Sequence, residues 1–303
     1  MKKYLIGVSG IVVVLLVIIG LILAPWKSMG TSKKPIRVVT GMNFYAEVAQ
    51  KVAGDHGQVT SFINNSSVDP HDYQPGTKEA QQVSKANVVI ENGIGYDSWM
   101  NKLVKSSDNR DKIKVINVAS LNGKKNGDNE HIWYDPSTMK KLANDLATQY
   151  GKIDPKHASD YRANAKKYLA SLKPLDNEIA KVKSQVNPNN NQVAVSEPVF
   201  DYALENAGYQ VMDKHFEKAI EDDNDPSPKD INEIQQAIIN HKIAFFVDNS
   251  QVSDKVVNNL VKLAHENNVP VLKVTETKPN GDNYTQWMLK QYRALSAIQQ
   301  KEK

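Results

Sequence analysis

Short apolar runs alternate with helix-forming segments through most of this 303-residue chain. In the first half, the predicted strands lie at 36–40, 59–63, 88–90 and 114–118. The same alternation returns in the second half, with strands predicted at 192–195, 209–212, 244–247 and 271–274. Strands that alternate with helices favour a mostly parallel sheet with helices on both faces. We therefore expect an α/β fold with two such lobes.

A long helix-forming stretch separates the two lobes. Residues 155–186 are rich in lysine and carry apolar side chains at helical spacing, including Tyr161, Ala165 and Leu172. Pro174 should kink this helix, because proline removes a backbone donor. We interpret the stretch as one connecting helix; two ordinary helices within a single domain are the alternative. The predicted organisation has four parts: an N-terminal anchor or signal with its tether at 1–35, an N-terminal lobe at 36–153, the connecting helix at 154–190 and a C-terminal lobe at 191–303.

The start of the chain indicates a membrane segment. Residues 5–24 carry no charge, and a helix of that length at about 1.5 Å rise per residue spans about 30 Å, the thickness of a bilayer core. The run is longer than the apolar core of a usual signal peptide, and Ala24-Pro25 is a poor cleavage site. We expect an uncleaved transmembrane anchor; a signal cleaved after Gly30, giving a secreted chain, and a buried soluble helix are the alternatives. The positive start Lys2-Lys3 places the body on the extracytoplasmic face of the cell membrane.

The composition excludes several classes of protein. The absence of cysteine excludes disulfides, thiolate ligands, a thiol nucleophile and lipid attachment at cysteine. Of the net charge of +4, three charges come from Lys2, Lys3 and Lys27, so the body offers little basic surface to nucleic acid. The sequence has no His-Glu-x-x-His helix, Gly-x-Ser-x-Gly turn or phosphate-binding glycine loop. We therefore expect neither nucleic-acid binding nor enzymatic activity.

Four candidate metal ligands follow predicted strands. Ligands of open α/β sheets bind beyond the carboxyl ends of the strands. His71 and His131 lie in loops after the second and fourth strands, and Glu197 and Glu276 directly follow the strands at 192–195 and 271–274. Two imidazoles and two carboxylates suit zinc, manganese or a similar divalent ion. No compact motif links the four, so these residues alone also allow loop histidines and solvated acids.

Several ordered segments resemble the substrate-binding proteins of zinc/manganese ABC importers. The resemblance covers essentially residues 36–300, and its main segments are DPHDYQPGTKEAQQVSKANVVIENGIGYDSWM, EHIWYDP, VSEPVFDYALENAGYQV, DPSPKDI, FFVDNSQVSD and TETKPNGDNYTQWM. It implies two α/β lobes joined by one long helix, with the metal in the cleft between them. It also implies a monomer that captures a divalent transition metal with high affinity and delivers it to the permease of a cognate ABC importer.

The resemblance also assigns the ligands. His71 and His131 match the two histidines of the family's N-terminal lobe, Glu197 matches a third ligand that is His or Glu, and Glu276 matches an acidic fourth ligand. Zinc is the favoured ion and manganese the alternative. The stretch 122–129 lacks the histidine-rich loop of some zinc-specific relatives, and the chain lacks the lipid-bearing cysteine of many others. An adhesion or regulatory protein on the same scaffold, or a surface metallohydrolase, are the alternative functions.

Other residues near these segments receive weaker interpretations. Asn249 is expected to hydrogen-bond near the ligands of the C-terminal lobe. Tyr73, Tyr96 and Trp133 could line the cleft, whereas helix packing equally explains Trp99. The acidic cluster around His215 is interpreted as a solvated loop, with weak cation binding as the alternative; its members are Glu217, Glu221, Asp222, Asp223 and Asp225.

Overall fold

The computed structural model of this chain describes residues 34–251 and 253–301. The predicted anchor at 5–24 and most of its tether lie outside the described residues. Within the described ranges, no helix is both long enough and apolar enough to cross a bilayer. These residues belong to one compact unit that begins at Lys34.

The first lobe is built on a four-stranded parallel sheet in the order β2-β1-β3-β4. Its strands are β1 (Ile36–Met42), β2 (Gly57–Ile63), β3 (Val88–Glu91) and β4 (Lys114–Asn117). Its helices are α2 (Asn43–Ala53), α3 (Thr77–Lys85), α4 (Ser98–Lys105), α5 (Val118–Leu121) and α6 (Thr138–Ile153). All four residues of β3 are buried, as expected for a parallel strand covered on both faces.

The second lobe repeats this topology with the strand order β6-β5-β7-β8. Its strands are β5 (Gln192–Val195), β6 (Gln210–Val211), β7 (Phe246–Asn249) and β8 (Val271–Val274). Its helices are α9 (Asp201–Ala207), α10 (Lys214–Glu221), α11 (Pro228–Ile239), α12 (Lys255–Glu266) and α13 (Tyr284–Lys301). The predicted fold of two α/β lobes with parallel sheets is therefore confirmed.

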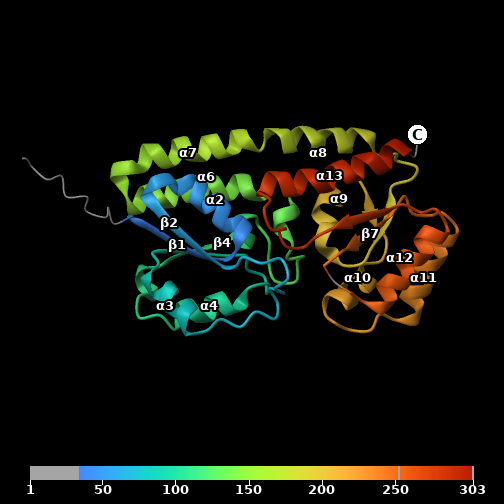
Figure 1. Ribbon diagram of the computed structural model, residues 1–303, viewed down its shortest axis with the longest axis horizontal. Coiled ribbons are helices and arrows are strands. Elements are labelled where there is room, and N and C mark those ends of the chain that lie inside the picture. The colour runs from blue at the N-terminus through green and yellow to red at the C-terminus, as the bar shows by residue number, and fades with distance from the viewer. Residues whose placement is uncertain (1–33, 252, 302–303) are drawn as a thin grey trace, which may run out of the picture. The chain divides into compact units, whose positions relative to one another are not determined.

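Two consecutive helices connect the lobes, α7 (Ala158–Ser171) and α8 (Lys173–Gln185). The interruption falls at Leu172, two residues before Pro174, where the helix was predicted to kink. Leu172 keeps right-handed helical dihedral angles, with φ −82° and ψ −10°, so α8 follows α7 closely. Helix α7 packs along α2 and α6, and α8 packs along α13 (Figure 1). The single connecting helix of the sequence prediction is thus two helices in series.

One hydrophobic core extends through both lobes. Phe44 of α2 packs against Trp133, which lies between β4 and α6, with tilted rings whose centroids are 5.0 Å apart. Phe44 also contacts Trp287 of α13, with ring centroids 5.7 Å apart. The Tyr284 hydroxyl of α13 donates a 2.6 Å hydrogen bond to the Trp133 carbonyl. A separate cluster fills the side of the second sheet under α10, α11 and α12. The shared core ties the end of the chain to the first lobe.

The main error of the sequence interpretation concerns the stretch around His215. The structure shows helix α10 there, capped by the Asp213 carboxylate, which accepts hydrogen bonds from the backbone of His215 and Phe216. Phe216 and Ile220, four residues apart, anchor the helix in the core. Because the helix has a buried face, part of the acidic cluster is turned away from solvent.

Candidate metal site

The strand order brings the ends of distant strands together. In the first sheet the direction of the strand order reverses between β1 and β3, and in the second sheet it reverses between β5 and β7. The loops that leave the carboxyl ends of these neighbouring strands diverge at that point. Glu197 follows β5, and Asn249 ends its neighbour β7. Glu276 follows β8, and the two histidines lie in loops after β2 and β4. All four predicted ligands therefore project from the carboxyl edges of the two sheets.

His71 lies in the loop between β2 and α3. Its backbone N–H donates a 2.8 Å hydrogen bond to Oδ1 of Asp69, which forms a local turn and fixes the backbone at His71. The Nε2 atom of His71 lies 3.9 Å from Oε1 of Glu276. The side chain is 35% exposed, so this imidazole is the member of the site that solvent reaches most easily.

His131 is fully buried, and its hydrogen bonds fix which ring nitrogen is free. Asn129 donates through Nδ2 to the Pro198 carbonyl at 2.6 Å, so its Oδ1 faces His131 as an acceptor. Nδ1 of His131, 2.9 Å from that oxygen, must then carry the proton. Nε2 keeps its lone pair, and it has no hydrogen-bond partner among the described residues. This is the tautomer that a metal ligand requires.

Burial also sets the charge of this imidazole. Burial lowers the pKa of His131 well below its usual value, and the neighbouring His71 adds to the effect. The ring is therefore neutral at physiological pH. A neutral ring with a free, buried lone pair is poised to bind a cation.

Glu276 completes this side of the site. Its Oε1 accepts a 2.8 Å hydrogen bond from the Tyr96 hydroxyl and lies 4.0 Å from Nε2 of His131. Burial raises the pKa of Glu276 to about 8, and the charges of Glu197, Asp69 and Glu130 act in the same direction. Tyr96 thus faces the site, whereas Trp99 packs against Tyr73 and donates to the Pro70 carbonyl.

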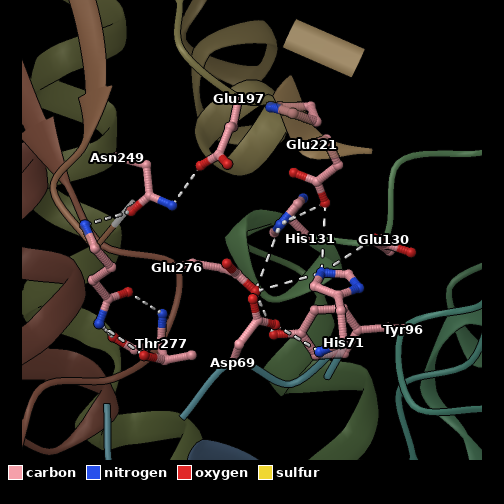
Figure 2. A network of polar contacts seen from close by, with 12 residues as sticks. Asp69, His71, Tyr96, Glu130, His131, Glu197, Glu221, Asn249, Glu276 and Thr277 are labelled. Carbon is pink, nitrogen blue, oxygen red and sulfur yellow. Dashed lines mark hydrogen bonds and ion pairs between the residues drawn. The ribbon is translucent and has the colours of Figure 1, made fainter. Parts of the chain in front are cut away.

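The Glu197 carboxylate is hydrogen-bonded within the second lobe, by Asn249. Its Oε2 accepts a 2.6 Å hydrogen bond from Nδ2 of Asn249, the contact expected for that asparagine (Figure 2). Burial raises the pKa of Glu197 to about 7. Within the described part of the chain, the carboxylates within 4.0 Å of the two imidazoles come from Glu130, Glu221 and Glu276 instead.

Glu130 and Glu221 are the site residues that the sequence interpretation missed. Oε1 of Glu130 lies 3.7 Å from Nε2 of His71. Oε1 of Glu221, at the end of α10, lies 3.6 Å from the same nitrogen and 3.7 Å from Nε2 of His131. The prediction of a solvated loop is wrong for Glu217 and Glu221, because the helical face that carries Phe216 and Ile220 turns both acids inward. The four-residue spacing of those two apolar residues was the signal available.

The buried carboxyl groups of the site would be stabilised by a bound cation. Burial and the neighbouring Glu276, Glu197 and Glu130 all raise the pKa of Glu221. Several carboxylates in a water-poor region destabilise one another unless they are protonated or neutralised. A divalent ion between these carboxylates and the two imidazoles would relieve that repulsion. The arrangement can therefore bind a metal ion with nitrogen and oxygen ligands.

The profile of the family described as zinc-uptake complex component A, periplasmic (ZnuA), matches residues 38–298. The chain belongs to this family. Among its relatives, the "Manganese-binding lipoprotein MntA" of Halalkalibacterium halodurans is 28% identical over 188 residues, covering 60% of this chain and 62% of MntA. The "Manganese ABC transporter substrate-binding lipoprotein PsaA" of Streptococcus mitis is 25% identical over 295 residues, covering 91% and 93%.

Solved structures share the fold. The substrate-binding protein FpvC of Pseudomonas aeruginosa, determined in complex with Mn²⁺, superposes with a TM-score of 0.71 at 19% identity. The match covers 88% of this chain and 99% of that chain. The resemblance to metal-binding substrate-binding proteins of ABC transporters is thus confirmed at the level of the family.

Proposed function

We propose that this family member captures a divalent transition metal between its two lobes, outside the cytoplasm, and delivers it to the permease of an ABC importer. The observation that carries the proposal is the buried Nε2 of His131. This atom has a free lone pair, no hydrogen-bond partner among the described residues, and carboxylates of the second lobe within 4.0 Å. Leaving such an atom unpaired is costly, and a metal ion would satisfy it.

The proposed ligands are His71, His131, Glu197 and Glu276. The lobes contribute two each, so a bound ion would tie them together. Zinc and manganese are both candidates: imidazole suits zinc, and the relatives described above carry manganese in their names. Four protein ligands leave a tetrahedral ion no open position for water, which favours capture over hydrolysis.

Several features of the chain support transport rather than another role. The proposed N-terminal lobe (36–153), connecting segment (154–190) and C-terminal lobe (191–303) would form one monomer held by its shared core. The apolar run at 5–24 would anchor that monomer at the extracytoplasmic face of the membrane, in place of the lipid used by the lipoprotein relatives. The anchor would keep captured ions beside the permease.

Metal stoichiometry tests the proposal. The purified full chain, dialysed against Zn²⁺ and Mn²⁺ in parallel and measured by elemental analysis, should hold one ion. His71→Ala and His131→Ala should each lose at least about 100-fold in affinity, because each removes a direct ligand. His215→Ala, which removes an exposed histidine on α10, is the matched control and should bind as the unmodified chain does. Stoichiometric binding by both ligand variants would refute the site.

A further inference from the structure

We propose that Glu221, at the end of α10, is a fifth ligand of the transported metal and the residue that shifts the site toward manganese-type ions. The inference rests on the proposed function, because it concerns the same metal. It adds a ligand that neither the strand-end pattern nor the family resemblance assigns.

The first observation is the position of Oε1 of Glu221. It faces both imidazoles, 3.6 Å from Nε2 of His71 and 3.7 Å from Nε2 of His131 (Figure 2). Oε1 of Glu276 lies 3.9 Å and 4.0 Å from the same two nitrogens. Ligand atoms about 2.1 Å from a tetrahedral ion lie about 3.4 Å from one another. A small inward movement of these four atoms would therefore close them around one ion.

The second observation is that this oxygen lacks another partner. The Glu221 side chain is only 7% exposed, and Oε1 has no hydrogen-bond partner among the described residues. Glu197, by contrast, is held by Asn249. Burial of an ionisable oxygen without a hydrogen bond is costly. Its orientation toward Nε2 of His71 and toward the buried Nε2 of His131, which has no hydrogen-bond partner among the described residues, indicates a ligand position.

The third observation concerns the helix that presents Glu221. The Asp213 cap fixes the start of α10, and Phe216 and Ile220 lock its inner face into the core, so the last residue of the helix cannot easily turn away. Its neighbour Asp222 is exposed and paired with Lys218. The inward direction of Glu221 is thus built into the fold and is not shared by the acid beside it.

A fifth ligand changes which ion the site prefers. Three carboxylates and two imidazoles give an oxygen-rich donor set, and carboxylate and water ligands suit manganese, whereas zinc prefers four ligands. Glu221 would therefore contribute more to the binding of manganese than to that of zinc.

Competition titrations of Mn²⁺ and Zn²⁺ with the full chain and Glu221→Gln test this role. The variant keeps the size of the side chain and removes its charge. We expect the affinity for Mn²⁺ to fall at least about 30-fold and the affinity for Zn²⁺ less than about fivefold. Asp222→Asn, which removes a charge of the same sign one residue away, is the matched control and should change neither affinity.

The outcomes separate this inference from the proposed function. If Glu221→Gln binds both ions as the unmodified chain does while His71→Ala binds neither, Glu221 is not a ligand and the proposed function stands. Equal losses for both ions would overturn its role in selectivity. Unchanged binding by all of these variants would refute the proposed function itself.

A crystal structure of the manganese-loaded, unmodified chain tests the ligand without any variant. It should show Oε1 of Glu221 within about 2.4 Å of the ion, the range of oxygen ligands. An ion coordinated by Glu197 with Glu221 turned away would overturn the assignment.

Discussion

Asn129 joins His131, a proposed metal ligand of one lobe, to the backbone of the other lobe, and its removal should weaken metal binding. Its side chain makes three hydrogen bonds: it accepts from the backbone N–H and from Nδ1 of His131, and it donates to the Pro198 carbonyl, next to Glu197. Loss of a partner that orients a metal-binding histidine typically costs 10- to 100-fold in affinity, or about 1.4–2.8 kcal/mol. We expect a loss of that size for Asn129→Ala.

The same variant should also lower the free energy of unfolding. Three hydrogen bonds at about 1 kcal/mol each give about 3 kcal/mol. Asn129→Asp separates the two effects, because it keeps the acceptor for the imidazole but loses the donor to Pro198. It should therefore retain more metal affinity than Asn129→Ala and lose less of the free energy of unfolding, about 1 kcal/mol for the one hydrogen bond to Pro198.

Isothermal titration calorimetry and urea unfolding measure the two quantities on the full chain. Asn122→Ala is the matched control, because Asn122 lies in the same connection between β4 and α6. Among the described residues, its side chain hydrogen-bonds through Nδ2 to the local Val118 carbonyl alone. It should leave metal affinity unchanged. If Asn129→Ala loses stability but binds metal within about threefold of the unmodified chain, Asn129 supports the lobes without orienting His131, and the reasoning fails.

Two other predictions concern the metal-free chain and its response to the ion. The pKa of Glu197 is raised to about 7 and that of Glu276 to about 8, so the folded state keeps protons that the unfolded state has lost. The free energy of unfolding should therefore fall as pH rises from about 4.5, by up to about 1.4 kcal/mol per pH unit for each group, until about pH 7 for Glu197 and about pH 8 for Glu276. In urea unfolding, Glu276→Gln should flatten this slope. Because one core spans both lobes, we expect the lobes to move little relative to one another when a metal binds. Spin labels introduced by Lys102→Cys and Lys229→Cys in this cysteine-free chain should report a distance change below about 2 Å on metal loading. A larger change would refute this expectation.

The alternation of strands and helices, and part of the site, followed from the sequence alone. Hydrophobic periodicity is local, so it predicts elements without any knowledge of packing. Parallel strands gather their carboxyl ends at one edge, so His71 and His131 could be recognised as candidates from their loops.

Only the tertiary structure decided which side chains face one another there. In the sequence, Glu221 is one acid among several in a polar stretch, and the spacing of Phe216 and Ile220 is the one local signal that separates it from Asp222. Its inward direction depends on α10 packing against the second sheet through Phe216 and Ile220. Likewise, the free nitrogen of His131 depends on Asn129 meeting the Pro198 carbonyl of the other lobe. The sequence determined which residues could bind a metal; contacts between segments far apart in the chain decided how those residues are oriented and charged.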